Sequence, residues 1–187
     1  MIILLSSIAP AQLEPTIYAA EPQWSQVGLD GNEIRSLAIN PVDSEIVYAV
    51  VNDTSGLYRT NNGGSSWSKI HAYPHSVVTL NPQYPATVYA GLSYQVWKSL
   101  DNGDHWVEVA SAGASTHRAI VVDPSNPNTV YLGVQDGWGV FKTTTGGAGW
   151  TSQLSSQSIL SLALNPQNTQ EIYAGSAQYY TTPGGIW

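Results

Sequence analysis

The chain has 187 residues, of which only 10% are charged, and its formal net charge is −7. This length suits one domain with a sizeable core, while six Lys and Arg side chains on an acidic chain argue against a nucleic-acid partner. No apolar run is long enough to span a membrane as a helix, and the absence of cysteine excludes disulfides and thiolate-bound metal.

Residues 1–23 allow two interpretations. Met1–Leu5 and the Ala9-Pro10-Ala11 sequence hint at a short leader, although no cationic region precedes the apolar run. The alternative is a decayed copy of the repeat that follows, because Pro10 is succeeded by Tyr18 much as Pro41 is succeeded by Tyr48. The sequence leaves both readings open, and residues 24–187 form the repeating part.

The repeat has a period of about 42 residues. Its prolines, at spacings of 41, 42 and 42, are Pro41, Pro82, Pro124 and Pro166. A tyrosine follows each proline after seven residues, at Tyr48, Tyr89, Tyr131 and Tyr173. Tryptophans close the units at Trp24, Trp67, Trp106 and Trp150. Such a period favours a propeller over a helical solenoid, provided that each unit consists of short strands.

Each unit predicts four short strands, because β-branched and aromatic runs are bounded by Gly, Pro, Asn and Asp. First strands are expected at Arg35–Ile39, Val77–Leu80, Ala119–Val122 and Leu160–Leu164. Second strands are expected at Ile46–Val51, Thr87–Gly91, Thr129–Val134 and Glu171–Gly175. Third strands are expected at Leu57–Thr60, Val96–Ser99, Val140–Thr143 and Ile186–Trp187. Fourth strands are expected at Trp67–Ile70, Trp106–Val109 and Trp150–Leu154, with Trp24–Val27 as a spare fourth strand. No window keeps a helical period, so we expect almost no helix.

A recurring motif separates the third and fourth strands. It comprises Thr60, Asn62, Gly64 and Trp67, then Ser99, Asp101, Gly103 and Trp106, then Thr143, Thr145, Gly147 and Trp150. The pattern resembles the Asp-box, Ser/Thr-x-Asp-x-Gly-x-x-Trp, of bacterial-neuraminidase-repeat propellers such as sialidases, xyloglucanases and sortilin-like receptors. The resemblance covers roughly residues 24–187. It implies an all-β propeller of four-stranded antiparallel blades with Asp-box hairpins, about four of them in this chain, and leaves a larger ring open.

Physical chemistry assigns this motif to a hairpin turn. A hydroxyl and a carboxylate can accept hydrogen bonds from turn amides, and glycine permits a positive φ. Asp101 alone keeps the acid, so it is interpreted as scaffold rather than as a catalytic or metal-binding carboxylate. Thr145 is the weakest substitute, which makes the third turn the softest. Arg59, Lys98 and Lys142 share one register and are also expected to be scaffold.

The resemblance implies that two sets of loops share one face, those joining strands two and three and those joining strand four to the next blade. The candidate ligand-binding residues there are Arg35, His75, Tyr94, His117, Arg118, Trp138, Tyr179 and Tyr180. The two arginines, with a histidine beside Arg118 and another one repeat earlier, would place cations near a central channel. Aromatic loops with neutral hydrogen-bonding partners suit sugars. The alternative is a set of solvated loops without a ligand.

Two enzymatic functions, those of a sialidase and of an inverting glycosidase, each require particular residues. A sialidase needs an arginine triad, and this chain has three arginines with Arg59 already placed in scaffold. An inverting glycosidase needs two carboxylates roughly 6.5–9.5 Å apart. Asp53 and Asp136 lie in equivalent loops of different units and are weak catalytic candidates. Four histidines show no metal-ligand spacing, so neither a metal nor a cofactor is expected.

The sequence therefore favours a non-catalytic binding or scaffold module for a glycan or a protein partner. The alternative is a glycoside hydrolase, xyloglucanase-like or sialidase-like, or a fragment of one. Low charge and a Ser/Thr/Asn-rich surface suggest an extracellular or periplasmic protein. The last unit lacks a fourth strand, which predicts an open edge. That edge could be met by a longer ring, by strand exchange into a homo-oligomer, or by closure on Trp24–Val27.

Overall fold

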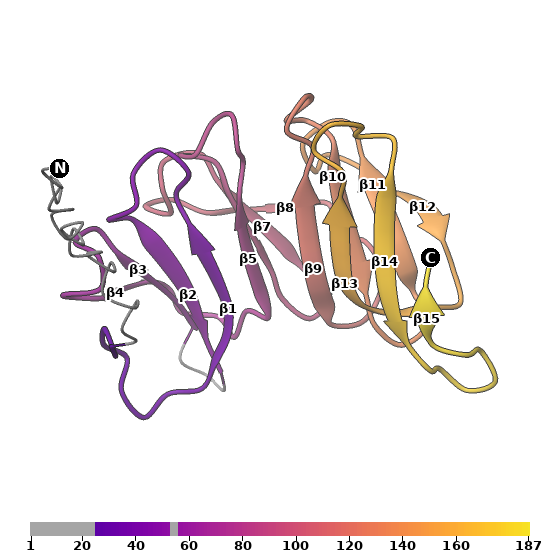
Figure 1. Cartoon of the computed structure of the whole chain (residues 1–187), viewed down its shortest axis with the longest axis horizontal. Coiled ribbons are helices and arrows are strands. Elements are labelled where there is room, and N and C mark those ends of the chain that lie inside the picture. The colour runs from indigo at the N-terminus through magenta and orange to yellow at the C-terminus, as the bar shows by residue number, and fades with distance from the viewer. Residues whose placement is uncertain (1–24, 53–55) are drawn as a thin grey trace, which may run out of the picture.

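The computed structural model describes residues 25–52 and 56–187. Within them the strands form three four-stranded sheets and one three-stranded sheet, each a meander of antiparallel neighbours, and there is no helix. Figure 1 shows the first strands of the four sheets, β1, β5, β9 and β13, standing side by side along an arc. These sheets are four blades of an all-β propeller, as the sequence predicts.

The strand bounds follow the repeat. Blade 1 comprises β1 (Ile34–Ile39), β2 (Val47–Val51), β3 (Gly56–Thr60) and β4 (Ser68–His71). Blade 2 comprises β5 (Val77–Leu80), β6 (Val88–Gly91), β7 (Val96–Ser99) and β8 (Val107–Val109). Blade 3 comprises β9 (His117–Val122), β10 (Val130–Val134), β11 (Gly139–Thr143) and β12 (Thr151–Leu154). Blade 4 comprises β13 (Ser158–Leu164), β14 (Ile172–Ala177) and β15 (Gly185–Ile186).

The predicted register is confirmed at the third strand of blade 4. Trp187 exchanges two backbone hydrogen bonds of 3.0 Å with Ala174. The equivalent pairs in the earlier blades are Ala49 with Tyr58, Ala90 with Trp97 and Leu132 with Phe141. Trp187 therefore occupies the third-strand position that the repeat assigns to an aromatic residue.

Some predictions fall outside the described residues, namely those on residues 1–23, on Trp24 and on Asp53. The described part of the spare strand Trp24–Val27 is not a strand, so that prediction is wrong there. Val27 instead accepts a 2.9 Å hydrogen bond from the Trp67 indole. The segment thus packs against the turn of blade 1 without joining a sheet.

The apolar core lies between blades. The junction of blades 1 and 2 buries Tyr48, Val50, Leu57, Val78, Leu80, Val88 and Ala90. The junction of blades 2 and 3 buries a second cluster, with Phe141 and Trp150 packed on it. On β1, by contrast, Leu37 and Ile39 are 65% and 58% exposed, although Val78 is 3% exposed at the position equivalent to Leu37. Val78 and Leu80 of β5 are thus buried against the preceding blade, and β1 lacks such a blade among the described residues.

The three turn motifs are built as their chemistry predicts. The hydroxyls of Thr60, Ser99 and Thr143 each accept the amide of the motif glycine, at 3.0, 2.8 and 3.2 Å. Those glycines have φ values of +93°, +93° and +106°, which a side chain would strain. Such turns leave few amides without a partner and fix the exit direction of the fourth strand.

The third turn is the least satisfied, as the sequence predicts. Asn62 Oδ1 accepts the amide of Ser66, and Asp101 Oδ1 accepts the amide of His105, both at 2.9 Å. Thr145 makes no equivalent bond to Gly149 among the described contacts, because its side chain is one atom too short and lacks a second acceptor. One turn amide therefore loses its side-chain partner.

The motif tryptophans are half-buried. Two of them bond to the outer part of the preceding unit, Trp67 to Val27 and Trp150 to Ala110 at 2.6 Å. Trp106 bonds within its own turn, to the Gly103 carbonyl at 2.9 Å. The indoles of Trp67 and Trp150 thus link their turns to the preceding unit, whereas that of Trp106 closes its own turn.

Candidate functional site

Two sets of loops meet along one edge of the arc, the lower edge in Figure 1. The β6–β7 loop bonds to the β8–β9 loop from the Tyr94 amide to the Ser115 carbonyl, at 3.2 Å. The β10–β11 loop bonds to the same β8–β9 loop at Thr116 and to the β12–β13 loop at Ser156. These loops form one connected row, which we call the loop row; it includes the β14–β15 loop, whose Tyr179 ring packs on Gly137.

Asp136 lies near the middle of the loop row. It adopts a left-handed backbone with φ of +56°, and its amide donates a 3.2 Å hydrogen bond to Ser158 Oγ. Ser115 Oγ donates a short hydrogen bond to Asp136 Oδ2. The Asp136 carboxylate is therefore held by Ser115 of the β8–β9 loop and its backbone amide by Ser158 of β13, which leaves the carboxylate with acceptor capacity to spare.

The neighbouring glycine brings an aromatic ring onto this carboxylate loop. Gly137 has φ of +82°, and a Cβ there would collide with the Tyr179 ring. Tyr179 and Tyr180 in turn form an edge-on pair with centroids 4.5 Å apart. Partial desolvation, followed by the nearby Tyr180 and Asp136, raises the pKa of Tyr179. Its hydroxyl is therefore a neutral donor at physiological pH.

Three aromatic side chains of the loop row are open to solvent. Tyr94 is 57% exposed, Trp138 is 42% exposed and Tyr180 is 83% exposed. They come from successive blades, 2, 3 and 4. Exposed aromatic faces in a connected row can stack on flat apolar surfaces while neighbouring carboxylate, amide and hydroxyl groups accept or donate hydrogen bonds.

The two histidines predicted for this face lie beneath it. His75 and His117 are 1% and 0% exposed. Burial, and then the neighbouring His71, lowers the pKa of His75 to about 3, and burial also lowers the pKa of His117. Both rings are therefore neutral near pH 7, so they do not supply the cations expected of them.

His117 instead contacts two loops from below, whereas His75 contacts another histidine. His117 places Nδ1 3.1 Å from the Gln95 carbonyl and Nε2 3.0 Å from the Ala112 carbonyl, and the neutral ring donates its single N–H to one of the two. It thereby joins the loops on which Tyr94 and Ser115 lie. His75 Nε2 is 2.6 Å from Nδ1 of His71, outside the loop row.

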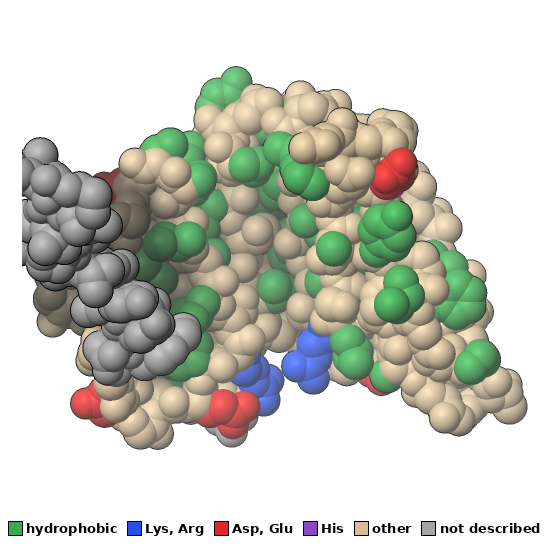
Figure 2. All heavy atoms as spheres, viewed as in Figure 1, with side chains coloured by type: hydrophobic (Ala, Val, Ile, Leu, Met, Phe, Trp, Pro, Cys, Tyr) green, Lys and Arg blue, Asp and Glu red, His purple; other side chains and the backbone are tan. Residues whose placement is uncertain are grey.

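The two arginines occupy one repeat position on first strands, as predicted. Arg35 lies on β1 with its Nε 3.9 Å from a carboxylate oxygen of Glu33. Arg118 lies on β9 and is exposed. On the face in Figure 2, Lys and Arg side chains gather at the lower edge of the central hollow, with acidic side chains close by. Arg35 belongs to blade 1.

The paired-carboxylate prediction stays a prediction, because Asp53 lies outside the described residues and only Asp136 is placed. Within residues 25–52 and 56–187, no three His, Asp or Glu side chains converge as metal ligands would. In the same part of the chain, no helix is long and apolar enough to cross a membrane.

Sequence reasoning missed two features. No spacing signal pointed to Ser158, whose hydroxyl accepts the Asp136 amide. It also missed an aromatic cluster on the outer side of blades 1 and 2, where the His71 ring lies 4.8 Å from Trp97 and 5.4 Å from Trp106. The shared aromatic register of Tyr58, Trp97 and Phe141 was the available signal for the cluster.

Comparison with known proteins finds xyloglucanases among the curated relatives. No family model matches the chain. A xyloglucanase of Hypocrea jecorina is 27% identical over 78% of this chain and 20% of that protein. Xyloglucanase Xgh74A of Acetivibrio thermocellus is 31% identical over 61% of this chain and 12% of that protein. The chain thus spans a fifth or less of these two curated relatives.

The solved structures support the fold. The crystal structure of a GH74 enzyme from Niastella koreensis matches with a TM-score of 0.70 and 16% identity, over 82% of this chain and 28% of that one. At this identity the likeness shows the fold alone, which is the β-propeller described above.

Proposed function

We propose that this chain is part of the carbohydrate-binding propeller of a xyloglucanase-like glycoside hydrolase, and that its loop row binds a β-glucan chain. The observation that carries the proposal is the 27% identity to a xyloglucanase over 78% of this chain. This favours the hydrolase alternative over the non-catalytic module preferred from the sequence. With such relatives, the three turn motifs are best assigned to the Asp-box type.

The chemistry of the loop row suits a polysaccharide. Pyranose rings offer flat C–H faces that stack on aromatic side chains, and Tyr94, Trp138 and Tyr180 are exposed on successive blades. Between them, the Asp136 carboxylate, which Ser115 holds in place, offers an acceptor for sugar hydroxyl groups. A row of such positions fits a linear chain better than a compact ligand. A polymer of this size would be met outside the cell, in keeping with an extracellular or periplasmic protein.

Asp136 is the described carboxylate best placed to act on a bound glycan. Glycosidic cleavage needs a second carboxylate as acid or base. Asp53 remains the candidate from the equivalent loop of blade 1. The other face of the blades is scaffold, since its turns are engaged in backbone hydrogen bonds.

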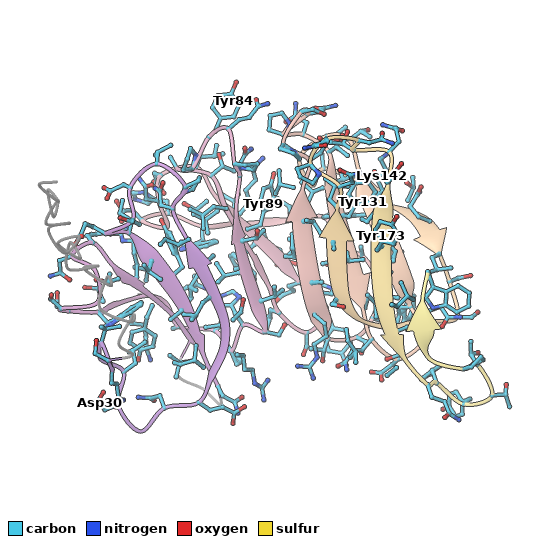
Figure 3. The ribbon with its side chains drawn as sticks, viewed as in Figure 1. Asp30, Tyr84, Tyr89, Tyr131, Lys142 and Tyr173 are labelled. Atoms are coloured by element: carbon cyan, nitrogen blue, oxygen red, sulfur yellow. The ribbon has the colours of Figure 1, made fainter. Side chains whose placement is uncertain are left out.

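Binding is tested by calorimetric titration of the 187-residue chain with xyloglucan oligosaccharides. Trp138→Ala and Tyr180→Ala are each expected to weaken binding about tenfold or more, because stacking on a sugar contributes at least 1–2 kcal/mol per ring. Tyr84→Ala is the matched control. Tyr84 is 61% exposed but lies at the opposite end of the blades from the loop row, as Figure 3 shows.

Turnover is tested separately by reducing-end release. Release that Asp136→Asn abolishes, with binding retained, would support a catalytic role for this carboxylate. Folded protein that neither binds nor cleaves xyloglucan would contradict the proposal, as would equal losses of binding in the Tyr84 control.

A further inference from the structure

Two tyrosines of the loop row stand on a left-handed backbone. Tyr94 has φ of +72° and Tyr180 has φ of +49°. A side chain of this size crowds the backbone at such angles, whereas glycine adopts them freely and asparagine and aspartate tolerate them. Each tyrosine therefore strains the loop that carries it, and a glycine at the same place would not.

Packing within the chain does not account for these two tyrosines. The side chains of Tyr94 and Tyr180 are both more than half exposed, so folding buries little of either ring. Among residues 25–52 and 56–187, they alone combine a left-handed backbone with a large exposed side chain. The other left-handed residues besides glycine are three with short polar side chains and one that is partly buried: Asn102, Asp136, Ser156 and Leu29.

The repeat shows that the left-handed position belongs to the loop rather than to the tyrosine. Tyr94 lies five residues after Tyr89 of β6, and Asp136 lies five residues after Tyr131 of β10. Asp136 has φ of +56°, so the same position is left-handed in blades 2 and 3. Blade 3 has an aspartate there, a residue type that accepts this conformation. The tyrosine of blade 2 is therefore the residue that departs from what the turn prefers.

Hydrogen bonds within the loop and from its neighbour hold Tyr94 in this conformation. The Leu92 amide donates to the Gln95 carbonyl at 2.9 Å and closes the turn, while the Tyr94 amide donates to the Ser115 carbonyl at 3.2 Å. The Gln95 carbonyl also lies 3.1 Å from Nδ1 of His117, which is fully buried. A strained backbone persists where its surroundings fix it in this way.

Tyr180 is fixed by a two-residue turn and by contact with the neighbouring blade. Tyr179 and Thr182 exchange backbone hydrogen bonds of 3.0 and 2.9 Å, which makes Tyr180 the first central residue of the turn. A positive φ at that place is normally supplied by glycine. The Tyr179 ring packs on Gly137 of the β10–β11 loop and meets the Tyr180 ring edge-on, at 4.5 Å between centroids. The direction of the Tyr180 ring is thus set from blade 3.

We propose that Tyr94 and Tyr180 are strained binding residues: their left-handed backbone lowers the stability of the chain and fixes two exposed rings in the orientation that stacks on a sugar chain. The inference rests on the proposed function, from which it takes the bound glycan. Strained residues that the fold itself does not need cluster at ligand-binding sites. Rings held in place before the ligand arrives also reduce the entropy that binding costs.

The strain is tested by thermal denaturation of paired glycine and alanine variants, both of which remove the ring. Tyr94→Gly is expected to melt about 2–4 °C above Tyr94→Ala, and Tyr180→Gly above Tyr180→Ala by a similar amount, because only glycine relieves the strain. Tyr84 is the control, since it is exposed and its backbone is not left-handed. There glycine is expected to melt about 1–3 °C below alanine, because it only adds freedom to the unfolded chain.

The binding role is tested on the same variants by calorimetric titration with xyloglucan oligosaccharides. Tyr94→Gly and Tyr180→Gly are each expected to bind about tenfold more weakly than the parent chain, or worse, because each loses a stacking ring. Both Tyr84 variants are expected to bind like the parent chain. Weaker binding by the glycine variants, which are more stable than their alanine partners, separates a role in binding from a loss of folding.

The outcomes distinguish this inference from the proposed function. A folded parent chain that binds no xyloglucan oligosaccharide would overturn both. Binding that Trp138→Ala weakens but that Tyr94→Gly and Tyr180→Gly leave unchanged would overturn the inference alone. Glycine variants that melt below their alanine partners at Tyr94 and Tyr180 would do the same, because they would show that the backbone there is not strained.

Discussion

At the scale of single residues, His75 shows how burial turns a candidate ligand into a stability determinant. Its ring is 1% exposed, packs 4.8 Å from His71 and reaches the Trp106 ring at 6.3 Å. Nδ1 of His75 is buried without a well-formed hydrogen bond. Protonation would place a charge next to another histidine in an apolar setting, which is why the pKa falls.

The pH dependence of stability follows from this shift. The pKa of His75 is about 3 when folded, against about 6.5 when unfolded, so the unfolded state binds more protons between these values. The free energy of unfolding should therefore fall as the pH drops below about 6.5, on the order of 4 kcal/mol by pH 3–4. His75→Gln should remove most of this slope, measured as the difference between variant and parent melting curves from pH 8 to pH 4.

His105 provides the control of opposite sign. Its hydrogen bond to Asp101, at 2.6 Å between Nδ1 and Oδ2, and the charge of that carboxylate raise the pKa of this exposed histidine. That contribution is fully present below about pH 6.5 and is lost as the pH rises through the folded value. His105→Gln should leave the acid-side slope unchanged; a slope that His75→Gln fails to reduce would refute the assignment.

At the scale of the element, strands and turns could be predicted well because their punctuation is local. Pro124 after an apolar run, and Gly103 before Trp106, mark boundaries that the structure keeps within a residue or two. The predicted fourth strand of the second unit begins at Trp106, whereas β8 begins at Val107, because the backbone of Trp106 completes the turn. The depth of His117 could not be predicted, since a histidine in a loop sequence gives no sign that two carbonyls will enclose it.

The bonds from tyrosines and cations to turn carbonyls of the next blade, Asn102 and Gly146, show the same limit. The spacing of Tyr48 and Tyr89 was visible, and so was the register of Arg59 with Lys98. That a hydroxyl and a cation would meet one carbonyl in the next blade depends on blade twist and spacing, which are tertiary properties. The loop row was predictable as a face from the resemblance, whereas the contact of Ser115 with Asp136 was not.

The softness of the third turn leads to a stabilising substitution. Thr145→Asp supplies the acceptor that Asp101 supplies in the second turn, where it holds the His105 amide at 2.9 Å. The variant is expected to gain about 0.5–1.5 kcal/mol in the free energy of unfolding, measured by urea denaturation. Thr145→Val, of similar size to threonine, should give no gain. Equal effects of the two changes would show that the amide does not need the acceptor.

At the scale of the whole molecule, burial depends on a neighbouring blade rather than on the strand itself. Leu37 and Val78 share one repeat position but are 65% and 3% exposed, because blade 1 packs against the first strand of blade 2. The second-strand tyrosines show the reverse trend along the arc: their exposure rises from 0% at Tyr48 and 1% at Tyr89 to 7% at Tyr131 and 54% at Tyr173. Leu37 in blade 1 and Tyr173 in blade 4 are therefore exposed at the two ends of the arc, whereas their repeat equivalents in blade 2 are buried.

This difference in burial predicts that replacement by threonine lowers the free energy of unfolding by different amounts at the two positions. Val78→Thr buries a hydroxyl in the core of blades 1 and 2 and should cost about 1–3 kcal/mol in the free energy of unfolding. Leu37→Thr at the same repeat position should stay within about 0.5 kcal/mol of the parent chain. Both are measured by thermal denaturation, and a large loss for Leu37→Thr would mean that a partner or another part of the chain covers β1 in solution.

Two pairs of a tyrosine and a cation, Tyr48 with Arg59 and Tyr89 with Lys98, bond a turn carbonyl of the blade that follows in the sequence. Tyr48 bonds a carbonyl 54 residues further along the chain, and Tyr89 bonds one 57 residues further. A chain synthesised from its N-terminus must therefore expose each pair at the ribosome until more than one further repeat has emerged. Folding during translation then advances one blade behind synthesis, and the newest blade is always the one with an open junction.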